Sequence, residues 1–168
     1  MRNSLSTTIA AGVLLTLAGV AQGATKFDSF LVSATVAKNC IINAPDLTFP
    51  DFDGATDVFA RSTISVRCTS GTTFDVDLST GSSTSYAMRT LRNGTDLLNY
   101  NLYADASYST IWGNNTGGSG RPATGIGAGM GAAQARQLTV YGRLRGSDNT
   151  GAVPAALYTD NIVATITY

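Results

Sequence analysis

Hydrophobic and polar residues alternate with a period of two along several stretches of the chain. Such alternation places successive side chains on opposite faces of a β-strand. It is found at residues 30–37, 64–68, 74–78, 98–102 and 162–168, with a shorter match at 138–142. Turn-forming residues such as Ser, Gly, Asn and Asp separate these stretches. About seven short strands at this spacing are typical of a β-sandwich, so the pattern predicts an all-β domain.

Composition agrees with this fold class and argues against several classes of function. The 168 residues are enough for one domain, and only 13% of them are charged. Eleven basic residues balance eleven acidic ones, so no basic excess supports binding of nucleic acid. The chain has neither His nor Glu, which removes Ser-His pairs, imidazole zinc sites and the commonest general base. We therefore expect a protein that is not an enzyme and that uses no cofactor, metal or small-molecule substrate.

The first residues have the features of an export signal. Arg2 gives a positive start, an apolar stretch follows at residues 9–20, and small residues surround Gly23. A transmembrane anchor is the less favoured interpretation, because a spanning helix needs ~20 apolar residues. We expect residues 1–23 to be a signal peptide that is cleaved after Gly23, which leaves a mature chain with a net charge of −1.

Export gives the two cysteines a structural interpretation. An even number of cysteines in an exported domain usually indicates a disulfide, and the mature chain has only Cys40 and Cys68. In the chain-entropy model, closing this loop contributes roughly 3–4 kcal/mol. A redox pair lacks the C-x-x-C spacing that would support it. We therefore expect a disulfide between Cys40 and Cys68.

Three stretches could be mistaken for ligand or catalytic sites. Residues 51–54 and Asp57 superficially resemble a calcium loop but lack its terminal Glu, so a solvated turn is the better interpretation. The glycine-rich run at 113–131 lacks a G-K-[ST] ending, so we expect a long flexible loop or loose hairpin. Asp75 and Asp77 share one strand face at about 7 Å spacing, which fits an inverting glycosidase pair. Any surface strand with two acids has this spacing, and we expect both to face water.

Five blocks of sequence together resemble one known family. They are Phe30-x-Val32-x-Ala34-x-Val36 before Cys40, Ser65-Val66-Arg67-Cys68 with Phe74-Asp75-Val76, Leu98-Asn99-Tyr100-Asn101-Leu102-Tyr103-Ala104-Asp105-Ala106 with Trp112-Gly113, Val140-Tyr141-Gly142-Arg143, and Tyr158-Thr159-Asp160 with the final strand. In this order, over nearly the whole mature chain, they resemble the spore coat U domain family. Bacterial members of that family include subunits of archaic chaperone–usher pili.

The resemblance implies an incomplete immunoglobulin-like β-sandwich that is completed by donor-strand complementation. Such subunits lack their last strand, and a periplasmic chaperone fills the resulting groove until the N-terminal extension of the next subunit replaces it. Residues 24–36 would be this donor-strand extension and residues 37–168 the sandwich. The donor anchors would be Phe30, Val32, Ala34 and Val36. The groove and chaperone contacts would come from Ile162, Ala164, Ile166 and Tyr168.

The alternation of apolar and polar residues at the two ends of the chain agrees with donor-strand complementation. The sequence ends on an alternating strand at Tyr168 with no following segment to cover its edge, while residues 24–36 supply an apolar strand ahead of the first cysteine. Adding the apolar segment of one subunit beside the last strand of another would cover both the segment and the strand edge. The alternative is that residues 24–36 are simply the first strand of a complete sandwich.

We therefore expect a structural pilus subunit that polymerises by donor-strand exchange for surface adhesion and biofilm formation. Its partners would be a periplasmic chaperone, an outer-membrane usher and homologous subunits in a homo- or hetero-polymer. It would be exported through the periplasm to a fimbrium on the cell surface. One alternative is a fibre-tip adhesin, although adhesins usually carry an extra receptor-binding domain. Another is a spore-coat or matrix protein that does not polymerise.

Overall fold

The computed structural model describes residues 23–121, 123–155 and 157–168. The signal peptide predicted at residues 1–23 therefore lies almost entirely outside the described residues. The chain divides into two units, Met1–Thr35 and Val36–Tyr168, which are described separately. In the first unit, residues 23–35 form neither strand nor helix. In the described part of the chain, no helix has the length and apolar character needed to cross a membrane.

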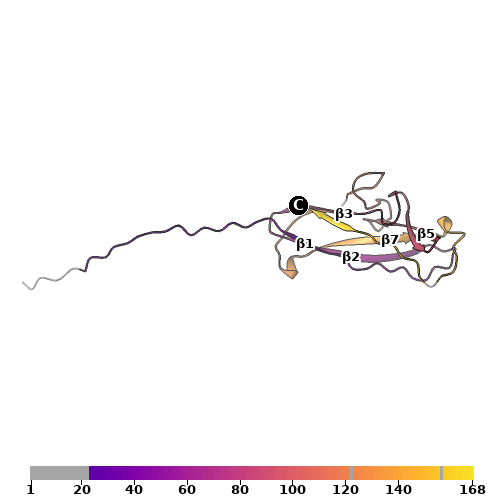
Figure 1. The fold of residues 1–168 in the computed structure, drawn as a ribbon, viewed down its shortest axis with the longest axis horizontal. Helices are drawn as coiled ribbons and strands as arrows, with labels where there is room; N and C mark the ends of the chain where they lie inside the picture. Colours follow the sequence, from indigo (N-terminus) through magenta and orange to yellow (C-terminus); the bar gives the residue numbers. More distant parts are fainter. Residues whose placement is uncertain (1–22, 122, 156) are drawn as a thin grey trace, which may run out of the picture. The chain divides into compact units, whose positions relative to one another are not determined.

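The second unit consists of two antiparallel sheets (Figure 1). The five-stranded sheet has the spatial order β1 (Cys40–Asn43), β2 (Val58–Cys68), β7 (Arg136–Leu144), β5 (Asp96–Tyr103) and β4 (Arg89–Asn93). The three-stranded sheet has the order β6 (Ala123–Ile126), β3 (Thr73–Leu78) and β8 (Ala164–Thr167). Two single 3₁₀ turns, η1 (Ala132–Gln134) and η2 (Gly146–Asp148), flank β7. The prediction of an all-β immunoglobulin-like sandwich is confirmed.

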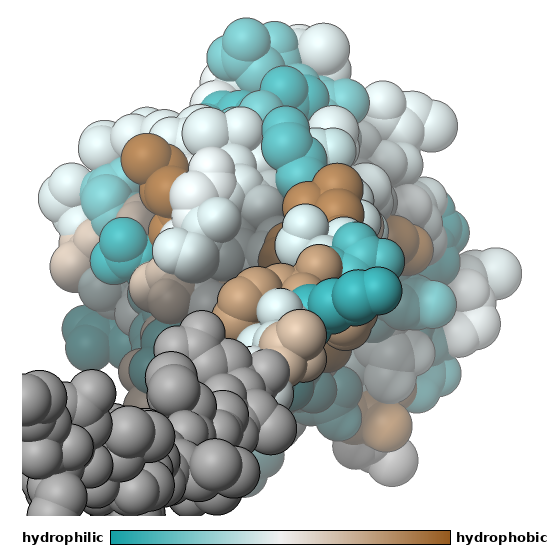
Figure 2. Space-filling view, turned by 90° about the vertical axis from the view of Figure 1, so that its left-hand side faces the viewer, coloured by the Kyte–Doolittle hydropathy of each residue, from teal (hydrophilic) through white to brown (hydrophobic). Residues whose placement is uncertain are grey.

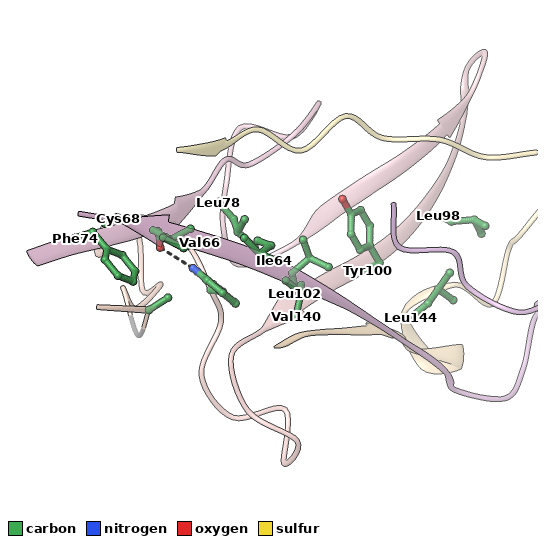
Figure 3. Packing of buried hydrophobic residues seen from close by; sticks show 13 residues of the cluster. Ile64, Val66, Cys68, Phe74, Leu78, Leu98, Tyr100, Leu102, Val140 and Leu144 are labelled. Carbon is green, nitrogen blue, oxygen red and sulfur yellow. Dashed lines mark hydrogen bonds between the residues drawn. The ribbon is translucent and has the colours of Figure 1, made fainter. Parts of the chain in front are cut away.

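The core lies between the sheets and follows the period-two pattern of the sequence. In β2, Ile64 and Val66 are buried, while Arg67 between Val66 and Cys68 is half-exposed. In β3, the apolar residues at positions 74, 76 and 78 are likewise buried. Figure 3 shows side chains of the two sheets meeting in this core. In a sandwich, a strand with alternating apolar and polar residues buries its apolar face between the sheets.

The glycine-rich run differs from our expectation. Instead of a loose loop throughout, it contains β6, which pairs with β3 in the smaller sheet. Gly125 lies opposite Phe74, and a Cβ atom at Gly125 would come within 2.6 Å of the Phe74 ring. The missing side chain lets a buried aromatic ring lie directly against the strand backbone. A glycine also contributes nothing to a hydrophobic pattern, so this strand has little signal in the sequence.

A buried arginine joins the two sheets near the β3–β4 connection. Arg89 is fully buried, and it donates hydrogen bonds to Ser79 O (3.0 and 2.8 Å), Trp112 O (2.7 Å) and Asn101 Oδ1 (2.6 Å). It forms no ion pair with a carboxylate among the described residues. Burial lowers the pKa of its guanidinium from the ordinary value. Asn101, on the polar side of the predicted alternation, is buried because it accepts from Arg89.

Candidate functional site

An open groove of about 850 Å³ lies between two segments that belong to no strand. One wall is residues 44–54, which follow β1, and the other is residues 152–155 and 157–162, which precede β8. The floor is apolar and comes from five strands of both sheets. Its residues are Ile64, Leu78, Leu91, Leu98, Tyr100, Leu102, Val140 and Leu144.

The first wall has no β-partner on its open side. No backbone–backbone hydrogen bond joins residues 44–54 to another residue that the structure describes. Leu47 and Phe49 nevertheless hold the wall in place, because both side chains pack over Gly142 of β7, within about 3 Å of where a Cβ atom would be. Phe49 also meets the ring of Tyr100 edge-on, with the ring centroids 5.9 Å apart. The wall is therefore fixed by its side chains and by one hydrogen bond from Ser62 Oγ to Pro45 O (2.9 Å), and it forms no backbone ladder with a described strand.

A disulfide fixes the start of this wall. Cys40 in β1 and Cys68 in β2 are directly opposite each other in the antiparallel ladder and form a disulfide. The pair that we expected from the sequence is thus present. The chain just before it is also paired, because Thr69 N donates to Asn39 O at 2.9 Å. The short edge strand β1 is consequently held to β2 at the point where the groove wall begins.

The second wall is tied to the larger sheet and to the loop between β3 and β4. Thr159 exchanges two backbone hydrogen bonds with Arg92 of β4, at 2.8 and 3.0 Å. Asp160 accepts hydrogen bonds from Tyr100 Oη (2.6 Å) and from the backbone N–H of Ser82 (2.7 Å). Burial raises the pKa of Tyr100 above its ordinary value, and the hydrogen bond to Asp160 adds to this shift. This wall therefore starts at the edge of the larger sheet and crosses to the smaller one.

The residues predicted for the groove are distributed unevenly. Ile162 and Ala164 line it. Ile166 is half-buried, pairs with Val76 and packs against the core, outside the groove lining. Tyr168 is 52% exposed and does not line the groove. The sequence reasoning missed the whole first wall, where Pro45 and Pro50 interrupt any alternation.

The residues predicted as a donor strand are fully exposed. Phe30, Val32 and Val36 are 87%, 79% and 85% exposed, and Ala34 is exposed as well. A run of exposed large apolar side chains is unusual in a soluble protein and is typical of an interaction site. On the face drawn in Figure 2, hydrophobic residues lie at the surface in several places among polar ones.

The aspartates considered above as calcium ligands or catalytic groups are bound by other groups of the same chain. Asp53 accepts the N–H groups of Ala55 and Thr56, which lowers its pKa, and so caps a turn. Asp57 binds Arg143 at 2.6 Å, which also lowers its pKa. Asp75 and Asp77 both pair with Arg121 on the sheet surface. Within the described ranges, no group of three or more His, Cys, Asp or Glu side chains is placed to hold a metal ion.

The groove has the geometry needed to accept an extended strand. Its floor is apolar, and the wall at residues 44–54 makes no backbone–backbone hydrogen bond to another described residue. Eleven residues of extended chain span at most about 36–40 Å, enough to pair with a strand of ordinary length. Main-chain hydrogen bonds supply affinity in such strand addition, and pockets for alternate side chains supply specificity.

Comparisons with known proteins agree with this geometry. A model of the Spore Coat Protein U domain family matches residues 26–165. Protein U of Myxococcus xanthus is 35% identical over 120 residues, which make up 67% of this chain and 62% of that protein.

A solved structure has a similar fold. It is the CsuC–CsuE chaperone–tip adhesion subunit pre-assembly complex from the archaic chaperone–usher Csu pili of Acinetobacter baumannii, with a TM-score of 0.57 and 20% sequence identity. The match covers 80% of this chain and 40% of the solved one. The chain thus spans less than two thirds of the length of either protein.

Proposed function

Because the chain belongs to the Spore Coat Protein U domain family, we propose that it is a structural subunit of an archaic chaperone–usher pilus. The family is structural and not enzymatic, in agreement with our expectation from the sequence. In this proposal residues 1–23 direct export, residues 24–36 act as a donor strand, and residues 37–168 form the sandwich that accepts one. The finished fibre lies on the cell surface and serves adhesion and biofilm formation.

One observation carries the proposal: a single chain has both an open groove and an exposed segment of alternating apolar residues. The groove has an unpaired wall at residues 44–54 and an apolar floor. The donor segment places Phe30, Val32, Ala34 and Val36 on one face when extended, and all four are exposed. Their burial would contribute on the order of 5–10 kcal/mol before entropic costs.

A chaperone and an usher are the partners in this proposal. An apolar groove beside an unpaired edge favours aggregation, so it needs a temporary partner before the next subunit arrives. A periplasmic chaperone in the groove would provide this cover, and an outer-membrane usher would exchange it for the donor strand of a homologous subunit. The similar fold in a chaperone–subunit complex supports this proposal.

A tip position is the second candidate, because the similar solved structure is described as containing a tip adhesion subunit. The exposed donor segment favours an internal position over the tip. A terminal subunit has no further neighbour to complete, so apolar residues at positions 30–36 would serve no purpose there. A coat or matrix protein that does not polymerise would instead be a stable monomer.

A complementation experiment with two variants tests the proposal. Val32→Asp places a charge on the inserting face of the donor and leaves the groove intact. Leu157→Asp places a charge in the groove lining, at a residue that is 66% exposed and so tolerates the change in the monomer. Ser33→Asp is the matched control, because it adds the same charge on the opposite face of the donor.

Each oxidised protein is refolded from denaturant and followed by light scattering and by gel electrophoresis without boiling. We expect the parent chain and Ser33→Asp to give ladders of denaturant-resistant polymer. Each groove or donor variant alone should stay monomeric, while their mixture should stop at dimers, since each dimer has one defective groove and one defective donor left. Stable monomers of the parent chain would refute donor-strand exchange.

A further inference from the structure

The outer face of the larger sheet carries a cluster of aromatic and arginine side chains. It lies on β2, β7 and β5, which are neighbours in the sheet (Figure 1). The register places Arg61, Tyr141 and Tyr103 directly opposite one another, and Phe59 opposite Arg143 in the next row. The even-numbered residues beside this set in β7 are buried, so the odd-numbered set faces away from the core.

A further aromatic residue is folded onto this face by the loop that follows β5. Tyr108 has a φ of 56°, which few residues other than glycine adopt. Its ring packs against those of the strands, with centroid distances of 4.9 Å to Phe59 and 5.5 Å to Tyr103. The carboxylate of Asp105 holds the loop by accepting backbone N–H groups from residues 107–110. The fold itself therefore fixes the position of the Tyr108 ring.

Arg61 is the cation of this cluster that has no acidic partner. Arg143 lies over the Phe59 ring, with 5.7 Å to the centroid, but is paired with Asp57 at 2.6 Å. Arg61 is exposed and lies 5.1 Å from the centroid of Tyr141, and its guanidinium forms no ion pair with a carboxylate of the described residues. These cations would repel a cationic ligand, whereas a carboxylate can accept two parallel N–H groups from the guanidinium of Arg61.

Polar side chains continue the same face along β2 and β7. The next two rows pair Thr63 with Thr139 and Ser65 with Gln137, and all four residues are exposed or half-buried. Successive rows are about 7 Å apart along the strands. A sugar chain matches this arrangement, because its C–H groups are attracted to the faces of aromatic rings and its hydroxyls need hydrogen-bond partners.

We propose that this outer face binds an acidic polysaccharide. Phe59, Tyr108 and Tyr141 pack against its sugar rings, and Arg61 binds a carboxylate. The groove floor is formed by the core-facing side of the same sheet, so this site is separate from the groove and does not depend on strand exchange. If the chain polymerises, the site is repeated in every subunit, and weak binding at each one adds up along the fibre.

Isothermal titration calorimetry of the mature chain with oligogalacturonate, a carboxylated sugar chain, tests this inference. The fully methyl-esterified oligomer is the matched ligand, because it has the same rings without the charge. Arg61→Met removes the carboxylate partner, and Phe59→Thr removes ring surface at a residue that is 46% exposed. Arg136→Met is the control, because Arg136 is exposed in β7 but has the even numbering of the core-facing residues.

We expect the parent to bind oligogalacturonate about tenfold more tightly than the ester, and Arg61→Met to lose that difference, because a hydrogen bond to a charged group is lost. Phe59→Thr should weaken binding of both ligands, Phe59→Trp should retain it, and Arg136→Met should match the parent. Absence of binding by the parent, or equal affinities for the parent and Arg61→Met, would overturn the inference. Bundling of assembled chains that Phe59→Thr abolishes, without any sugar binding, would also overturn it, since the face would then be a protein contact.

Discussion

Replacing the buried Arg89 with Met should destabilise the sandwich strongly. Methionine has a similar length but no donor, so the carbonyl oxygens of Ser79 and Trp112 lose the charged partner that the structure gives them. Each buried polar group left unpaired costs about 1–3 kcal/mol, which gives about 2–6 kcal/mol for the two. Asn101 Oδ1 contributes less, because it keeps a hydrogen bond from Leu102 N at 2.9 Å.

Part of this loss is offset, because the substitution also removes a cation that burial makes unfavourable. That burial lowers the pKa of Arg89, which shows that the charged form is disfavoured there. We therefore expect a net loss of about 2–4 kcal/mol, a large share of the stability of an ordinary domain. Arg89→Lys should lose less, since an ammonium group can still donate up to about three hydrogen bonds.

The measurement is urea unfolding of the oxidised monomer, made in a Val32→Asp background to prevent assembly. Trp112 is the only tryptophan and is buried, so its fluorescence reports unfolding, with circular dichroism as a second probe. With a slope of about 2 kcal/mol/M, the midpoint should fall by about 1–2 M. Arg61→Met is the control, because Arg61 is exposed over the Tyr141 ring and its loss should cost less than about 1 kcal/mol. Equal midpoints for the two arginine variants would refute the reasoning.

Three further predictions concern the groove walls and the core. Cys40→Ser should lower stability by roughly 3–4 kcal/mol in urea unfolding, and reducing agent should have no further effect on that variant. Tyr100→Phe removes the hydrogen bond to Asp160. The pKa of Tyr100 is raised in the folded state. The contribution of the neutral Tyr100 side chain to the free energy of unfolding is therefore full below its unfolded pKa of about 10 and is lost progressively as the pH rises above that value. The urea midpoint should therefore fall more steeply at alkaline pH in the parent than in the variant. Gly125→Ala should lose about 1–3 kcal/mol by overpacking, whereas Gly151→Ala, with open space around it, should not.

The strands that face the core could be predicted because their signal is local. Ile64 and Val66 alternate with polar residues, and the structure buries them as the period-two pattern requires. The same holds for Phe74, Val76 and Leu78. A sheet that is covered on one side imposes this pattern on each strand separately, so no knowledge of its neighbours is needed.

The groove wall and the buried arginine could not be predicted because their signals are not local. Asn101 occupies a polar position in an alternating strand and is buried because it accepts from Arg89, twelve residues earlier, and donates to the carbonyl oxygens of Tyr86 and Ala87. Leu47 and Phe49 stand in a stretch interrupted by prolines, and they are positioned by Gly142, almost a hundred residues later. In each case the decisive contact joins two segments that are separated in the sequence, and no periodic pattern of residues links them.

An empty apolar groove would be expected to close, since water favours contact between its walls. Several restraints keep it open. The disulfide at Cys40 holds the strand that leads into one wall, and the packing of Phe49 on Tyr100 holds the middle of that wall. The bonds of Thr159 and Asp160 hold the other wall to the larger sheet and to the β3–β4 loop. In the proposed assembly, these restraints would hold both walls in place before a donor strand arrives. Binding would then have to order only the incoming segment, so more of the free energy of its burial would be left to stabilise the assembly.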